Sequence, residues 1–82
     1  MMEVETFRIE DIYVPAKRRR TIDPETVNAI AENMLEKGQK TPILVRNDGD
    51  RLILVEGLQR LEACRSLGEE TILGMIVQAR RK

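Results

Sequence analysis

The sequence predicts an α+β domain with a small mixed β-sheet and two main helices. Two segments place apolar residues at helical spacing, and short runs typical of β-strands lie before, between and after them. The length of 82 residues favours one domain that spans 1–82. A chain of this size buries only about 60% of the surface that it exposes when unfolded, so we expect a small core.

The first predicted strand covers residues 4–9, where apolar and polar side chains alternate as they do in a half-buried strand. A second extended segment follows at residues 12–15. The sequence then reads Lys-Arg-Arg-Arg at 17–20, which we expect to form a basic loop before the first helix.

The first predicted helix begins at Asp23 and Pro24. Aspartate is a good N-cap residue, and proline fits the first helical position because its missing N–H is not needed there. Gly38 is typical of the end of such a helix. The apolar residues that share one stripe of this helix are Val27, Ile30, Ala31, Met34 and Leu35.

A β-hairpin is predicted next, with strands at residues 43–46 and 51–55. The residues between them, 47–50, are Asn-Asp-Gly-Asp, which adopt the positive φ angles of a hairpin turn at little cost. We assign Asp48 and Asp50 to this turn, and the sequence predicts no metal site.

The second helix is predicted over residues 58–67 and ends at Gly68. A last strand covers residues 71–77, and a basic tail at 78–82 belongs to the same domain. The residues with the spacing of one helical face, which are therefore expected in the core, are Leu61, Cys64 and Leu67.

The composition limits the classes of function that fit this chain. It has 14 Lys and Arg against 14 Asp and Glu, so a charge-based function must come from local clusters. One cysteine and no histidine exclude an internal disulfide, a cysteine–histidine zinc site and a protease-like triad. No apolar run approaches the roughly 20 residues of a membrane span, and the N-terminus has no signal-peptide core. We therefore expect a cytoplasmic protein without membrane contact.

The start of the second helix is the first candidate site. A strand that turns through Gly57 directly into a helix leaves the first helical N–H groups unpaired, and the helix dipole adds positive charge there. Gly57 has no Cβ that would keep an anion from the backbone, and Arg60 lies about 5 Å further along the helix axis. This pattern predicts a phosphate clamp. The alternative is a tight turn with a surface arginine that pairs with Glu56 or Glu62.

The basic segment of Lys17, Arg18, Arg19 and Arg20 is the second candidate. Its consecutive cations create a local positive potential in a neutral chain. If the segment folds over the second helix, an arginine can bind the outer phosphates of a nucleotide; if it stays in solvent, it can contact a nucleic-acid backbone. The alternative is a solvated loop without a specific ligand.

Three motifs, in this order, resemble the N-terminal domain of ParB-like proteins, which share their fold with sulfiredoxin. Residues 14–25 are similar to the family's asparagine-proline and glutamine-proline-arginine pattern before a helix start. Residues 38–46, which contain Thr-Pro-Ile-Leu-Val-Arg, are similar to its glycine, glutamine-proline-isoleucine and valine-rich strand. Residues 57–63, Gly-Leu-Gln-Arg-Leu-Glu-Ala, lie where ParB proteins carry glycine-glutamate-arginine-arginine-x-arginine-alanine. Together the motifs cover nearly the whole chain.

The resemblance implies a nucleotide site, since ParB proteins bind CTP and sulfiredoxins bind ATP at this corner, with the phosphates on the second helix. Gly57 and Arg60 match the phosphate motif, and Arg19 matches the arginine of the earlier basic motif. Mg²⁺ is an expected companion of the nucleotide. The residues that we assign to phosphate or nucleotide binding are Gly57, Leu58, Gln59, Arg60, Arg19 and Arg20.

Departures from the family pattern predict weaker binding of a triphosphate. Leu58, Gln59 and Glu62 replace a glutamate and two arginines, which removes two cations and adds an acid. Thr41 also replaces the usual glutamine. Sulfiredoxin carries a cysteine and a histidine where this chain has Leu58 and Gln59, so its thiolate chemistry is not expected here.

We interpret the chain as a binding module for a nucleotide or a nucleic-acid phosphate. The sequence ends soon after the last strand, so we expect no helix-turn-helix and only nonspecific DNA contact. One alternative is a small nucleotide-dependent enzyme of the kinase, NTPase or nuclease kind that uses Glu56 as a general base. Another is a protein-interaction domain with a vestigial nucleotide site. A homodimer that enlarges the small core is a further expectation.

Overall fold

The computed structural model describes residues 3–77 of the chain, so the predicted basic tail at 78–82 lies outside the described residues. A 3-10 turn at Ile9–Asp11 separates the first two strands. The strands are β1 (Glu5–Arg8), β2 (Ile12–Tyr13), β3 (Ile43–Asp48), β4 (Arg51–Glu56) and β5 (Thr71–Ile76), and the α-helices are α1 (Ala16–Arg19), α2 (Pro24–Lys37) and α3 (Leu58–Ser66).

The strands form one five-stranded mixed sheet in the order β1-β5-β3-β4-β2. β1 pairs antiparallel with β5, and β3 pairs antiparallel with β4 in the predicted hairpin. The pairs β3–β5 and β2–β4 are parallel, and helices lie between their strands in the sequence, as parallel connections require. The predicted α+β class, with a mixed sheet and two main helices, is confirmed.

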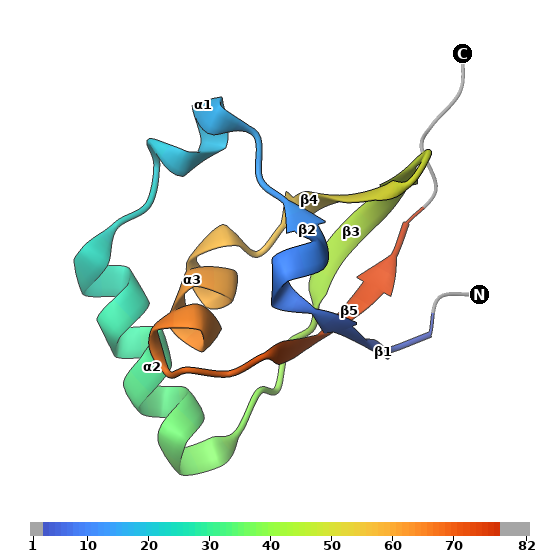
Figure 1. Cartoon of the computed structure of the whole chain (residues 1–82). Helices are drawn as coiled ribbons and strands as arrows, with labels where there is room; N and C mark the ends of the chain where they lie inside the picture. Colours follow the sequence, from blue (N-terminus) through green and yellow to red (C-terminus); the bar gives the residue numbers. More distant parts are fainter. Residues whose placement is uncertain (1–2, 78–82) are drawn as a thin grey trace.

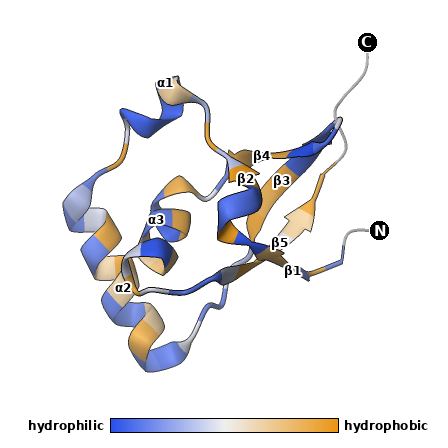
Figure 2. Ribbon diagram, in the orientation of Figure 1, coloured by the Kyte–Doolittle hydropathy of each residue, from blue (hydrophilic) through white to orange (hydrophobic). Residues whose placement is uncertain are grey.

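The two longer helices lie on one face of the sheet (Figure 1). α3 packs against β3 and β5, and α2 packs against α3. Hydrophobic residues follow β3 and β4 up to the hydrophilic turn that joins them (Figure 2). This packing fixes the start of α3 beside the carboxyl end of β4. The buried residues of the main core are Ile9, Ile12, Val14, Ile43, Val45, Leu54, Leu58, Leu61, Cys64 and Ile72.

The boundaries predicted for the first helix are confirmed by its caps. The Asp23 carboxylate accepts a hydrogen bond from the N–H of Glu25 at 3.3 Å, and Gly38 ends α2 with φ = 75°. The hairpin turn is tighter than the sequence predicts, because Asp48 already belongs to β3 and Gly49 adopts φ = 63°.

Two expectations from the sequence are wrong in detail. Residues Ala16–Arg19 form the helical turn α1 rather than a loop, because Pro15 stands at the N-cap and its carbonyl oxygen accepts hydrogen bonds from the next turn. Leu35 is 73% exposed, so it lies outside the buried stripe of α2. The buried members of that stripe are Val27 and Ala31, with Ile30 and Met34 half-buried beside them.

Candidate phosphate-binding site

Gly57 joins β4 to α3 and adopts a left-handed backbone conformation with φ = 111°. A Cβ atom at this position would lie 2.7 Å from Cγ2 of Ile43, well inside contact distance. Glycine is therefore required by the backbone angle and by the close packing of the junction against β3. The expectation that the missing Cβ opens the backbone to an anion is wrong on this side of Gly57, because Ile43 fills the space.

The first turn of α3 has no side-chain cap in the described part of the chain. The N–H of Leu61 donates to the carbonyl oxygen of Gly57 at 2.8 Å, which is the first bond of the helical ladder. The N–H groups of Leu58, Gln59 and Arg60 precede that ladder, as the first N–H groups of any α-helix do. With the helix dipole, they place partial positive charge at the β4–α3 junction.

A groove of about 440 Å³ lies beside this turn and is lined by Glu56, Gly57 and Arg60. Arg60 is half-buried, and within residues 3–77 its guanidinium forms no ion pair. Glu56 is exposed, so the groove carries one carboxylate and one guanidinium near the helix start. The fold thus brings these three predicted site residues together. The other residues that line the groove are Thr41, Pro42, Leu44 and Met75.

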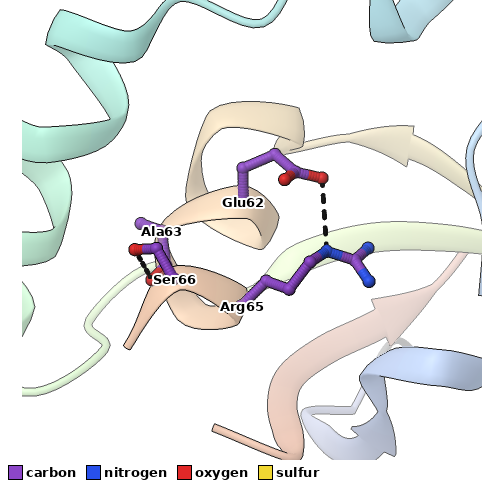
Figure 3. Close-up of polar contacts among 4 residues, drawn as sticks. All are labelled: Glu62, Ala63, Arg65 and Ser66. Atoms are coloured by element: carbon purple, nitrogen blue, oxygen red, sulfur yellow. Dashed lines mark hydrogen bonds and ion pairs between the residues drawn. The ribbon is translucent and has the colours of Figure 1, made fainter. Parts of the chain in front are cut away.

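Glu62, the acid that replaces a family arginine, pairs with Arg65 rather than with Arg60. Its Oε2 lies 3.4 Å from Nε of Arg65 on the same helix (Figure 3). In the same turn, Oγ of Ser66 donates to the carbonyl oxygen of Ala63 at 2.8 Å. The polar side chains near the end of α3 are therefore satisfied locally, and Arg60 is not paired with Glu62 in the described structure.

The side chains of Leu58 and Gln59 do not line this groove. Leu58 is 5% exposed and belongs to the core, so its contribution to an anion site is limited to its backbone N–H. Nε2 of Gln59 donates to the carbonyl oxygen of Thr21 at 2.8 Å. Oε1 of Gln59 accepts from the N–H of Asp23 at 3.0 Å. Gln59 therefore joins the start of α3 to the segment between α1 and α2.

The basic segment is attached to the same end of the sheet. Nη1 of Arg18 donates to the carbonyl oxygen of Val55, near the end of β4, at 3.0 Å. Lys17, Arg19 and Arg20 are exposed and do not line the groove. The structure therefore brings Arg18 to the junction, while the expected closure of Arg19 and Arg20 over the groove is not found among the described residues.

Cys64 is a core residue, as its spacing predicts. It is 2% exposed and lies among the apolar residues of α3 and the sheet. Burial raises the pKa of the Cys64 thiol above its ordinary value, the Glu69 carboxylate raises it further, and the Arg60 guanidinium lowers it. The neutral thiol is therefore favoured, whereas nucleophilic chemistry requires the thiolate.

Within residues 3–77, no group of three or more His, Cys, Asp or Glu side chains is arranged to hold a metal ion. Asp48 instead forms an ion pair with Arg51 at 3.5 Å, in keeping with its place beside the hairpin turn. Among the described helices, none has the length and apolar character needed to cross a membrane.

The fold is shared with solved proteins of two kinds. Sulfiredoxin from Arabidopsis thaliana is similar at 26% sequence identity with a TM-score of 0.85, over 94% of this chain and 86% of that chain. The C-terminally truncated chromosome-partitioning protein ParB from Caulobacter crescentus, complexed with CTP-gamma-S, is similar at 27% identity with a TM-score of 0.80, over 95% of this chain and 46% of that chain. These likenesses define the class as the ParB/sulfiredoxin fold.

Within this class, the family is given by the sequence. The model of the ParB N-terminal domain matches residues 1–82, and the chain belongs to this family. The probable chromosome-partitioning protein ParB of Campylobacter jejuni is 34% identical over 62 residues, which cover 76% of this chain. The chain spans only 22% of the length of that relative.

Two features of the site do not follow from the sequence. The first is the pair of hydrogen bonds made by Gln59, whose partners lie 36 and 38 positions away along the chain. The second is the largely apolar wall of the groove. Thr41 and Pro42 fall inside one of the motifs that carry the family resemblance, and this motif could have marked them as residues of the groove. Nothing in the sequence places Met75 beside them.

Proposed function

We propose that this domain binds a nucleotide through its phosphates at the first turn of α3. The observation that carries the proposal is the meeting of Arg60 with the uncapped start of α3 at the β4–α3 junction. N–H groups at a helix N-terminus and a nearby guanidinium are a favourable combination for a phosphate. The complex of the Caulobacter crescentus relative with CTP-gamma-S supports the same class of ligand.

The apolar wall of the groove supports a nucleotide rather than a bare anion. Pro42, Leu44 and Met75 are half-buried and line the groove together with Arg60. A ligand that combines an apolar ring with a phosphate can use both surfaces, because ligand sites usually join apolar walls to a few oriented polar groups. Inorganic phosphate is therefore expected to bind more weakly than a nucleotide.

The charges around the site favour modest affinity for a triphosphate. Gln59 and Glu62 stand where the family motif has arginines, and Glu56 places a carboxylate in the groove. Each missing cation removes a charge-assisted hydrogen bond to a phosphate oxygen. We expect Mg²⁺ to help, since it neutralises part of the phosphate charge. Cytoplasmic location and a homodimer stay predictions.

The test is a titration of the protein with CTP, ATP and ADP, with and without Mg²⁺, at two salt concentrations. Arg60→Ala is expected to weaken nucleotide binding by about tenfold or more, because it removes a charge-assisted hydrogen bond. Arg65→Ala is the matched control, since Arg65 lies on the same helix and outside the groove. Equal affinities for the unsubstituted protein and Arg60→Ala would contradict the proposal.

A short DNA duplex is the second ligand in the same titration. Lys17, Arg19 and Arg20 are exposed, which suits nonspecific contact with a nucleic-acid backbone. Binding of DNA with a steep salt dependence, together with no response to nucleotides, would favour a nucleic-acid module over a nucleotide module.

A nucleotide-dependent enzyme is the second candidate, because Glu56 lines the same groove as Arg60. A carboxylate at this position could act as a general base toward a hydroxyl or water beside the phosphates. The measurement is Mg²⁺-dependent release of phosphate from CTP and ATP. Turnover that disappears in Glu56→Gln, while binding persists, would support the enzyme; no turnover in the unsubstituted protein would favour the binding module.

A further inference from the structure

We propose that Gln59 is a positioning residue, which holds the arm of residues 16–23 against the first turn of α3 before any ligand binds. The arm comprises α1 and the link to α2, and it carries the exposed Arg19 and Arg20. The proposal rests on the proposed phosphate site and concerns how that site is built. In it, the side chain of Gln59 is a tether for the arm and not a ligand of the phosphate.

The Gln59 amide is well suited to this role because it uses a donor and an acceptor together. Nε2 donates to the carbonyl oxygen of Thr21 at 2.8 Å, and Oε1 accepts from the N–H of Asp23 at 3.0 Å. Both partners are backbone groups of the arm. The amide therefore pairs with the backbone on either side of Ile22, and it fixes where this part of the arm lies relative to α3.

A second contact holds the other half of the arm. Nη1 of Arg18 donates to the carbonyl oxygen of Val55 at 3.0 Å. The two tethers are linked by a tight turn, since Oγ1 and N–H of Thr21 donate to the carbonyl oxygen of Arg18 at 2.7 and 2.9 Å. Arg19 and Arg20 lie between the tethers in the sequence, so the backbone that carries them is held relative to the start of α3, while their side chains are exposed.

Replacement of the family arginine by Gln59 exchanges a cation for this tether. A guanidinium has no acceptor atom, so an arginine side chain at this position could not accept the N–H of Asp23. The amide loses the attraction of a positive charge for phosphate, but it orders the arm in advance. A ligand then binds without the entropy cost of ordering that segment, which partly offsets the lost charge.

Amide hydrogen exchange in the ligand-free chain tests the tether directly. In Gln59→Leu the N–H of Asp23 loses its acceptor, and we expect its exchange to become about fivefold to tenfold faster. Gln59→Glu keeps an acceptor oxygen for the N–H of Asp23 but loses the donor to Thr21, so exchange at Asp23 is expected to lie between that of the unsubstituted protein and that of Gln59→Leu. The N–H of Leu61, which bonds to Gly57 within α3, reports that the helix itself is intact in each variant. Unchanged exchange at Asp23 in Gln59→Leu, with α3 intact, would overturn the proposal.

A double-mutant cycle with inorganic triphosphate separates positioning from direct contact. Replacing Arg19 and Arg20 together by alanine is expected to weaken binding by about threefold in the unsubstituted protein and to have little effect in Gln59→Leu. Additive losses would overturn the positioning role, since they would make Gln59 an independent ligand.

The two proposals fail in different ways. If inorganic triphosphate and nucleotides do not bind the unsubstituted protein at all, the proposed function fails. Exchange at Asp23 still decides the tether, because it is measured without ligand. If nucleotides bind through Arg60 but exchange at Asp23 does not depend on Gln59, the function stands and the tether is wrong.

Discussion

The N-termini of α2 and α3 are built in opposite ways. At the start of α2, the Asp23 carboxylate accepts from the N–H of Glu25 at 3.3 Å and from Oγ1–H of Thr26 at 2.6 Å. Pro24 removes one of the N–H groups that would need a partner. At the start of α3, Gly57 offers no capping side chain. The N–H of Glu25 is thus paired within the cap of α2, whereas no side chain of the described residues caps the first turn of α3.

The difference predicts that the two helix starts attract an anion unequally. A capped N-terminus already carries a carboxylate, which repels an incoming phosphate and occupies its donors. An uncapped start forgoes roughly 1 kcal/mol of helix stability that a good capping residue supplies. In this domain, that cost falls on the helix whose first turn adjoins Arg60 and the groove.

The largest expected effect is at the junction itself. Gly57→Ala is expected to lower the free energy of unfolding by about 2–4 kcal/mol, because it combines a left-handed backbone with a clash against Ile43. Urea unfolding monitored by circular dichroism measures this change.

Gly49→Ala is the matched control for Gly57→Ala. Gly49 has φ = +63°, but nothing lies within 4 Å of its added Cβ, so we expect a loss of only about 1 kcal/mol. Equal losses for the two variants would mean that the packing against Ile43 contributes nothing, and that the junction is free to adjust.

Removal of the cap on α2 should affect stability and not ligand binding. Asp23→Ala is expected to cost about 1 kcal/mol in urea unfolding, because the N–H of Glu25 and the hydroxyl of Thr26 lose their acceptor. Asp23→Ser retains a capping oxygen and should recover most of the loss. Affinity for nucleotide should stay unchanged in both, since Gln59 contacts the backbone N–H of residue 23 and not its side chain. A marked loss of affinity would show that the two helix starts are not independent.

Much of the fold follows from local signals in the sequence. Asp23, Pro24 and Gly38 mark the ends of α2 through capping preferences that depend on neighbouring residues alone. The exposure of Leu35 could not be predicted in the same way, because it depends on how much of the 14-residue α2 is covered by the 9-residue α3. Helical spacing alone places Leu35 in the apolar stripe of α2.

The site was predictable in part. Glu56, Gly57 and Arg60 are adjacent or one turn apart, so their meeting at the helix start follows from local geometry. The position of the basic arm depends on Arg18 and Gln59, each of which reaches a backbone group more than thirty residues away: 37 positions for Arg18 and 36 and 38 for Gln59. Such contacts leave no local pattern.

A smaller effect is expected for the carboxylate in the groove. Glu56→Gln removes a negative charge near the proposed phosphate site and keeps the shape of the side chain. We expect nucleotide affinity to rise by about twofold to threefold at low salt, and the gain to shrink as salt screens the charge. Calorimetric titration at two salt concentrations measures both. A fall in affinity would mean that Glu56 contacts the ligand or its metal ion. The start of α3 would then differ from that of α2 by this carboxylate as well as by its missing cap.

The smallest expected effect is a pH dependence of stability caused by the Cys64 thiol, which is buried in the middle of α3. Burial and Glu69 raise the pKa of the Cys64 thiol, so the folded state holds the thiol proton more tightly than the unfolded state does. This contribution to stability is complete below the ordinary pKa of 9.0 and is lost as the pH rises through the raised value. The midpoint of urea unfolding should therefore fall as the pH rises from 9.0 through the raised pKa of the thiol, and Cys64→Ala should remove that part of the slope. Arg60 lowers the same pKa, so Arg60→Ala should raise it further and shift the loss to higher pH. Unchanged pH dependence in Arg60→Ala would contradict this link between the guanidinium and the Cys64 thiol.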